Sequence, residues 1–139
     1  MYLLDTDVLS GLRRSRRSTV HAWIETVPPS DLFLSAATIG EIEFGIERQR
    51  TCNPSFAREL ADWLDITLRV YGERILPFTV EIVRRWGRLG AQLGNRQPDL
   101  MIAATALDHG LTVVTRNVSE FELAGVPVFN PFDPRPELP

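Results

Sequence analysis

The sequence contains no lysine, a single cysteine and only two histidines among its 139 residues. The lone Cys52 excludes an internal disulfide and a cysteine-based metal cluster, and we expect it to be a partly buried structural thiol. Long apolar runs are missing too, since none approaches the roughly 20 residues that a membrane-spanning helix needs. The opening residues reach a carboxylate, Asp5, too early for a secretory signal peptide. These absences predict a soluble protein of the reducing cytoplasm, with no membrane association.

The composition is that of an ordinary globular domain, with 44% hydrophobic and 24% charged residues. The formal net charge of −3 is a weak argument against a nucleic-acid partner, because such binders are usually basic. A site that gathers carboxylates around cations, however, carries its own negative charge until the cations arrive. All fifteen basic residues are arginines.

Short apolar runs alternate with amphipathic helical patterns along the chain. The predicted strands cover residues 2–4, 32–34, 75–77, 111–114 and 126–129. Ser18 and Ser35 are candidate helix N-caps, and Gly94 and Gly110 are candidate helix ends. This alternation predicts an α/β fold with a parallel sheet covered on both faces.

Several segments between these elements have less regular patterns. We expect a loop around residues 52–54, a helix after it with Leu68 on its inner face, and a short turn containing Phe121. Residues 1–130 read as one domain, and residues 131–139 as a proline-rich, extended or frayed tail.

Three carboxylates stand at the ends or first turns of these elements. Asp5 ends the first strand, Asp99 lies in the first turn of a helix, and Glu41 lies one turn into another. If these ends converge, the charges repel one another, which raises pKa values or calls for a cation. Oxygen-only ligands suit magnesium or manganese rather than zinc or copper. Each residue also has an ordinary reading, as a helix cap, a first-turn acid or a solvated side chain.

The order and context of these residues resemble the four motifs of PIN-domain ribonucleases. The motifs correspond to residues 2–10 (YLLDTDVLS), 35–46 (SAATIGEIEFGI), 98–106 (PDLMIAATA) and 114–121 (VTRNVSEF). Together with the final strand they span residues 2–129, nearly the whole chain. The residues of these motifs are most similar to those of the FitB-like branch of VapC-type toxins. The resemblance implies a PIN-like three-layer α/β/α sandwich with a short central parallel sheet.

The chain departs from the family pattern at three positions. Asp7 stands where the family usually has asparagine, which adds a carboxylate near the site. Asn117 stands where aspartate is frequent, and Glu120 keeps a carboxylate with a longer reach than the aspartate common in this branch. None of these departures removes Asp5, Glu41 or Asp99.

The resemblance implies hydrolysis of RNA phosphodiester bonds by metal-activated water, with Mg²⁺ as cofactor and Mn²⁺ as a substitute. It places Asp5, Asp99 and Glu41 as metal ligands, with Asn117 and Glu120 in supporting catalytic roles. The products would carry a 5′-phosphate and a 3′-hydroxyl. The implied partners are the RNA substrate, a small DNA-binding antitoxin that neutralises the toxin, and a second copy in a homodimer or toxin–antitoxin hetero-oligomer.

The arginines offer two candidate RNA or antitoxin contacts, although either group also reads as a solvated face. The first comprises Arg13, Arg14, Arg16 and Arg17, and the second Arg84, Arg85, Arg88 and Arg96. The two histidines, His21 and His109, are expected at the surface and outside the chemistry.

Two other functions compete with the nuclease. A haloacid-dehalogenase-type phosphatase fits Asp5 as nucleophile and Asp7 as acid–base, but that family also uses a lysine, which this chain lacks. A catalytically inactive PIN-like binding module is the second alternative, and the presence of Asp5, Glu41 and Asp99 argues against it.

Overall fold

The computed structural model describes residues 1–14, 18–95 and 97–132 of the chain. In chain order the elements are β1 (Tyr2–Leu4), α1 (Thr6–Arg14), α2 (Thr19–Ile24), η1 (Pro29–Asp31), β2 (Leu32–Ser35), α3 (Ala36–Cys52), α4 (Pro54–Tyr71), η2 (Gly72–Arg74), β3 (Ile75–Leu76), α5 (Val80–Leu93), α6 (Pro98–His109), β4 (Thr112–Val114), α7 (Val118–Leu123) and β5 (Val128–Phe129). None of the described helices is long and apolar enough to cross a membrane.

The strands form one parallel sheet in the order β3-β2-β1-β4-β5. Leu3 of the central β1 is in register with Phe33 of β2 and with Val113 of β4. The chain moves outward from β1 through β2 to β3 and then returns to the other side of β1 as β4. Ligands of open parallel sheets bind at the carboxyl ends of the strands where the strand order reverses. Here that place lies after β1 and β4.

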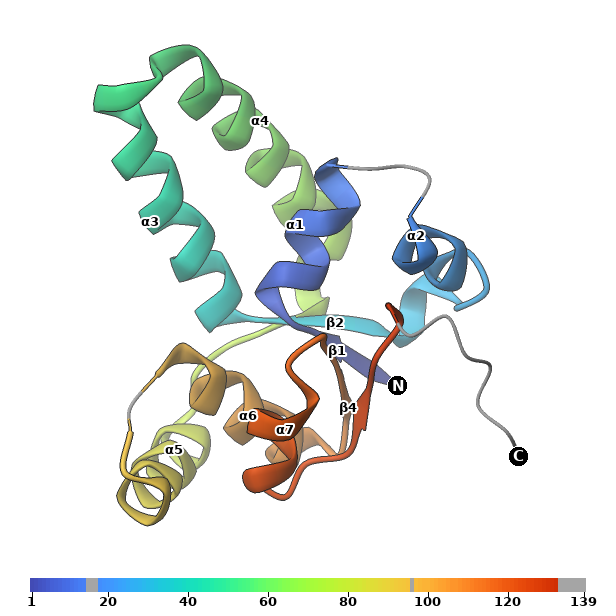
Figure 1. Cartoon of the computed structure of the whole chain (residues 1–139), viewed down its shortest axis with the longest axis vertical. Helices are drawn as coiled ribbons and strands as arrows, with labels where there is room; N and C mark the ends of the chain where they lie inside the picture. The colour runs from blue at the N-terminus through green and yellow to red at the C-terminus, as the bar shows by residue number, and fades with distance from the viewer. Residues whose placement is uncertain (15–17, 96, 133–139) are drawn as a thin grey trace.

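Helices cover both faces of the sheet, because successive side chains of its buried strands point in opposite directions. Leu3 and Val113 are fully buried in a core shared with α6 and α7, with α5 packed at its edge. Leu4 and Val114 are fully buried in a second core shared with α1, α2, α3 and α4. Figure 1 shows the paired α3 and α4 projecting on one side and α5, α6 and α7 gathered on the other. The predicted three-layer α/β/α sandwich is thus confirmed.

The local signals at helix ends agree with the structure. The Ser18 and Ser35 hydroxyls accept hydrogen bonds from the first-turn amides of α2 and α3, each at 3.1 Å. Gly94 and Gly110 follow α5 and α6 with φ of 72° and 65°, in the left-handed region that favours glycine.

Several expectations need correction. Only Asn53 separates α3 from α4, so the predicted loop at residues 52–54 is absent, and Cys52 is exposed rather than partly buried. Leu68 is 37% exposed because it falls outside the stripe of α4 that packs inward. The segment around Phe121 is the helix α7, with Phe121 as its buried anchor.

The C-terminal segment was expected to be an extended tail from residue 131. Phe132 instead packs against the second core and against the Arg116 guanidinium, 3.9 Å from its ring centroid. Residues 133–139 lie outside the described residues, and the domain boundary at residue 130 remains a prediction.

Candidate active site

Asp5 is a buried carboxylate held at the carboxyl end of β1, with only 3% of its surface exposed. Its backbone amide continues the ladder by donating to the Val114 carbonyl at 3.0 Å. Its Oδ1 accepts a 2.7 Å hydrogen bond from the Thr6 amide, and its Oδ2 accepts a 2.8 Å hydrogen bond from the Thr115 hydroxyl. The side chain is therefore fixed from both sides of the β1–β4 crevice.

Glu41 reaches the same place from α3. The Thr6 hydroxyl donates to Oε1 of Glu41 at 2.8 Å and lies 3.0 Å from the hydroxyl of Thr38, which is fully buried one turn earlier on α3. Because the Thr6 amide also binds Asp5, a single residue links the carboxylates of β1 and α3.

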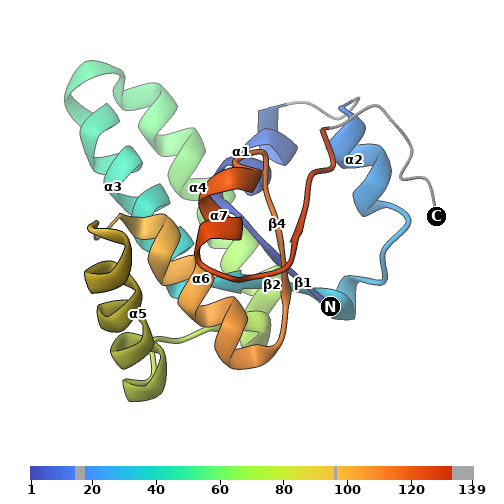
Figure 2. The same ribbon diagram turned by 60° about the horizontal axis from the view of Figure 1, so that its bottom comes forward.

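Asp99 and Glu120 approach from the opposite layer of the sandwich. Asp99 lies in the first turn of α6 and Glu120 in the first turn of α7, and both line one small cavity. The two helices pack against each other (Figure 2). The charges of Asp5, Glu120 and Glu41 all raise the pKa of Asp99, so Asp99 lies within electrostatic reach of the other three carboxylates.

The pKa values of three of these groups are raised. Burial is the main cause for Asp5, whose pKa rises to about 6; the Thr115 hydrogen bond opposes this rise, and the charges of Asp7 and Glu41 add to it. Burial also raises the pKa of Glu41, against the hydrogen bond from Thr6. The pKa of Asp99 rises to about 7 through burial first, and then through the hydrogen bond that protonated Asp99 donates to Glu120.

Asn117 and Asp7 stand at two of the positions where the chain departs from the motifs. Among the described contacts, neither side chain hydrogen-bonds to Asp5, Glu41 or Asp99. The Asn117 backbone amide donates to the Thr115 hydroxyl at 2.9 Å, and its side chain does not cap α7. Exposed Asp7 acts through its charge, which raises the pKa values of Asp5 and Glu41. Thr6 therefore joins Asp5 to Glu41, one cavity joins Asp99 to Glu120, and the effect of charge on the pKa of Asp99 links the two pairs. No hydrogen bond of the Asn117 side chain to this cluster is found among the described residues.

The sequence did not single out the threonines that position these carboxylates. Thr6 and Thr115 directly follow β1 and β4, and Thr38 lies one helical turn before Glu41. The sequence marks these threonines only by their positions. Thr6 is next to Asp5, Thr38 lies one helical turn before Glu41, and Thr115 directly follows a strand.

The donor set fits a hard divalent cation, because it consists of carboxylate oxygens whose raised pKa values reflect burial and mutual repulsion. Within residues 1–14, 18–95 and 97–132, however, no three aspartate, glutamate, histidine or cysteine side chains lie close enough together to form a complete metal site. Such spacing is compatible with Mg²⁺, which commonly keeps several waters and uses only one or two protein carboxylates.

The arginine groups are only partly described. Arg13 stacks over the Phe56 ring with 5.3 Å to its centroid, and Arg14 is exposed beside it. On α5, Arg84 and Arg88 are exposed and Arg85 is half-buried. Arg16, Arg17 and Arg96 lie outside the described residues.

Among the described residues, the acidic neighbours of the two histidines are nearby in the sequence and are not Asp5, Glu41, Asp99 or Glu120. His21 Nε2 is 3.8 Å from Glu25 on α2, and exposed His109 is 3.9 Å from its neighbour Asp108. His21 is half-buried rather than fully at the surface.

Comparisons with known proteins agree with this architecture. The family model described as "PIN domain" matches residues 2–124. The chain is 35% identical to a VapC ribonuclease, Y4jK of Sinorhizobium fredii, over 96% of this chain and 99% of the relative. The crystal structure of FitAcB from Neisseria gonorrhoeae superposes with a TM-score of 0.82 at 34% identity, covering 96% of this chain and 99% of that chain. A toxin–antitoxin complex from Klebsiella pneumoniae contains a chain with a TM-score of 0.71 and 27% identity, covering 94% and 98%. The protein therefore belongs to the PIN-domain family, in the branch of the VapC and FitB proteins.

Proposed function

We propose that this protein is a divalent-metal-dependent endoribonuclease and the toxin of a toxin–antitoxin pair. The observation that carries the proposal is the group of carboxylates with raised pKa values at the point where the strand order reverses. A relative named as a ribonuclease, matched over nearly its whole length, supports the reaction. The phosphatase alternative loses its basis, because the chain belongs to a nuclease family and has no lysine.

We infer that the cation is Mg²⁺, with Mn²⁺ as a substitute. Asp5, Asp99 and Glu41 would hold it, with waters completing the coordination. When bound, such a cation lowers the pKa of a water ligand and neutralises charge on the scissile phosphate and the leaving oxygen.

The residues around the cation site orient the Asp5 carboxylate and control the protonation of Asp99. Thr115 and Thr6 fix both oxygens of Asp5, so that this carboxylate does not need to reorganise when the site fills. Burial and the neighbouring Glu120 raise the pKa of Asp99 to about 7, so cation binding must displace any proton that Asp99 holds before this side chain can act as an ionised ligand. Asn117 and Glu120 support the reaction from nearby. The products carry a 5′-phosphate and a 3′-hydroxyl.

The RNA strand requires positive charge to offset that of its phosphates. Arg14 after the first motif, and Arg84 and Arg88 on α5, are exposed and available for such contacts. Each would contribute broadly to affinity rather than to sequence selectivity.

We further propose that the protein acts in the cytoplasm. We also propose that it forms a homodimer through a mostly apolar groove between α3, α5 and α6, here called the α3–α5 groove, which Glu41 also lines. Its main cavity has a volume of about 550 Å³, and Phe78 and Met101 line both this cavity and a smaller one toward α5. Phe44, 65% exposed, stands on the rim of the hollow. Because the protruding Phe44 and the cavity lie on one face, Phe44 of each copy could enter the cavity of the other in a two-fold symmetric dimer.

The proposed antitoxin is a small DNA-binding protein that covers the acidic site. The related toxin–antitoxin complex supports this partner. An arginine of the antitoxin could replace the charge of the cation among Asp5, Glu41 and Asp99, because guanidinium pairs strongly with carboxylates.

The direct test is cleavage of total cellular RNA by the protein purified free of antitoxin. New 5′-phosphate ends are mapped in Mg²⁺ or Mn²⁺ for the wild type, for Asp99→Asn, for the wild type in EDTA, and for Asp108→Asn. The last variant is a matched control, since Asp108 lies at the opposite end of the same helix. We expect discrete ends for the wild type and Asp108→Asn, and none in the other two reactions.

The same experiment separates the nuclease from an inactive PIN-like binding module. An inactive module yields no metal-dependent ends, and neither Mg²⁺ nor Mn²⁺ at millimolar concentration shifts its thermal unfolding. Ends that persist in EDTA or in Asp99→Asn would show that another enzyme produces them.

A further inference from the structure

A second cavity adjoins the carboxylate cluster on the side of α5, α6 and α7. Its volume is about 180 Å³, and it lies between the end of α5, the start of α6 and the helix α7. It is lined by Leu93, Asn95, Gln97, Asp99, Leu100, Ala103, Glu120, Phe121 and Leu123. We infer that this cavity holds the nucleobase next to the scissile phosphate and selects a base that carries an exocyclic amino group. The inference rests on the proposed ribonuclease activity.

The lining matches the two kinds of contact that a flat base requires. The aliphatic side chains of Leu93 and Leu123 offer contacts for the faces of a ring, with buried Phe121 between the cavity and the core. Leu123 is 72% exposed at the rim of this cavity. The cavity volume of about 180 Å³ is smaller than the roughly 300–1,000 Å³ typical of sites for drug-sized molecules. This small volume favours a single planar group as the ligand.

The polar side chains of the cavity are amides and carboxylates, which hydrogen-bond to the edges of bases. Gln97 is the N-cap residue of α6, yet its side chain makes no capping hydrogen bond. The Asn95 Oδ1 accepts from the Gln97 amide at 3.2 Å, which orients Asn95 and leaves its NH₂ group for other acceptors. Amide side chains can donate to and accept from one base at the same time.

The carboxylates decide which ligand the cavity favours. Asp99 and Glu120 repel a phosphate in the absence of a cation, but as acceptors they suit the amino groups of adenine, cytosine or guanine. Uracil has no such group. Because Asp99 belongs both to this cavity and to the proposed metal cluster, the base held here belongs to a nucleotide that flanks the scissile phosphate.

The test is a cleavage assay on a random-sequence single-stranded RNA library in Mg²⁺. Sequencing of the new ends gives the relative cleavage rate for each base at each position around the cut. The variants are Glu120→Gln, which exchanges an acceptor-only carboxylate for an amide that can also donate, and Gln97→Leu. The matched control is Gln92→Leu, an exposed glutamine on α5 that does not line the cavity.

For the wild type we expect a preference against uracil at one nucleotide adjoining the cut, by about tenfold or more. Glu120→Gln should reduce this discrimination by about tenfold, because the new amide can also donate to the carbonyls of uracil. Gln97→Leu should also reduce it, through the loss of one contact to the base edge, and Gln92→Leu should leave it unchanged. A wild-type enzyme that cleaves without base preference next to the cut would overturn the inference, as would unchanged discrimination in both cavity variants. Complete absence of cleavage by the wild type would instead overturn the proposed ribonuclease activity, and this inference with it.

Discussion

The Thr115 hydroxyl donates a 2.8 Å hydrogen bond to Oδ2 of Asp5, although 110 positions separate the two residues in the sequence. The bond spans the crevice between the ends of β1 and β4. It opposes the effect of burial on Asp5, since it lowers a pKa that otherwise rises. The Thr115 hydroxyl also accepts from the Asn117 amide, so one side chain orders both the carboxylate and the turn that leads into α7.

Replacing Thr115 by valine should therefore weaken the site without removing a proposed ligand. We expect the pKa of Asp5 to rise further and the Mg²⁺ affinity or the cleavage rate to fall by about 10- to 100-fold. Calorimetric Mg²⁺ titration and RNA cleavage rates measure the effect. Thr105→Val is the matched control, because Thr105 is equally buried and donates only to the Met101 carbonyl of its own helix. Equal losses in the two variants would contradict a specific role of Thr115.

The metal-free protein should lose stability as the pH rises from about 4 to about 7. In this window folded Asp99 and Asp5, with pKa values of about 7 and about 6, hold protons that the unfolded chain has released near its ordinary pKa of 3.8. Their stabilising contribution is complete below pH 4 and lost above pH 7. Thermal unfolding in EDTA at pH 5 and pH 8 should show a smaller loss for Asp99→Asn than for the wild type. Parallel behaviour of the two proteins would show that Asp99 has no raised pKa.

Divalent cations should stabilise the fold at neutral pH. Saturation at 10 to 100 times the dissociation constant adds about 1.5–3 kcal/mol to the free energy of unfolding. Thermal unfolding in increasing Mg²⁺ or Mn²⁺ measures this gain. Asp99→Asn should lose most of the response, and Asp108→Asn should keep it. A response of equal size in both variants would place the binding site elsewhere.

Arg74 joins three segments of backbone near the start of β2. Its guanidinium donates to the carbonyls of Pro29, Leu32 and Val70, and stacks on the Tyr71 ring at 4.8 Å. Arg74→Met should destabilise the protein by about 1–3 kcal/mol, because the variant loses three charge-assisted hydrogen bonds, of which the one to the Leu32 carbonyl is partly buried. Denaturant unfolding measures the change.

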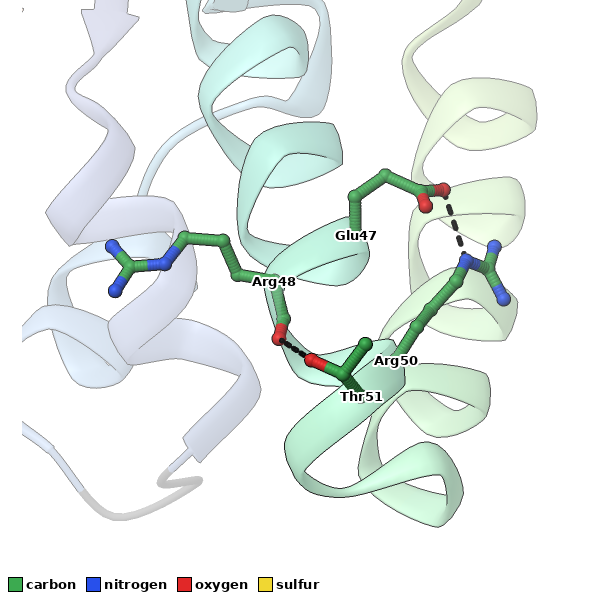
Figure 3. A network of polar contacts seen from close by, with 4 residues as sticks. All are labelled: Glu47, Arg48, Arg50 and Thr51. Atoms are coloured by element: carbon green, nitrogen blue, oxygen red, sulfur yellow. Dashed lines mark hydrogen bonds and ion pairs between the residues drawn. The ribbon is translucent and has the colours of Figure 1, made fainter.

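The control for Arg74 is an arginine that makes only a surface ion pair. Arg50 donates to Glu47 at 2.9 Å and both side chains are exposed, while Arg48 points away from this pair (Figure 3). Arg50→Met should leave the unfolding midpoint unchanged, because exposed ion pairs contribute little. If both substitutions have the same effect, the contacts of Arg74 are not specifically stabilising.

A charge placed in the α3–α5 groove should prevent the proposed dimer. Phe44→Glu puts a carboxylate on its apolar rim, and Ile66→Glu makes the same change on α4, where Ile66 is 51% exposed outside the groove. Light scattering with size-exclusion chromatography should give a monomer for Phe44→Glu and a dimer for the wild type and Ile66→Glu. A wild type that is monomeric at high micromolar concentration would overturn the proposed interface.

The sequence by itself determined the features that depend on neighbours along the chain. Apolar runs such as Leu111–Val114, serine N-caps and the glycines after α5 and α6 encode local backbone conformations, so periodicity and capping chemistry reveal them. Spacing placed Asp5, Glu41 and Asp99 at or near the ends of elements but left their convergence conditional. The resemblance to the PIN-domain motifs, rather than the spacing, predicted one acidic site.

Only the tertiary structure decided which side chains meet and which are buried. The Thr6–Glu41 and Thr115–Asp5 hydrogen bonds join segments 35 and 110 positions apart, and no local pattern encodes such pairings. The exposure of Cys52 and Leu68 and the helical form of residues 118–123 depend equally on packing. The physical reason is that periodicity reports the face a residue shares with its neighbours. Burial, pKa and hydrogen-bond partners depend instead on what the rest of the fold brings against that face.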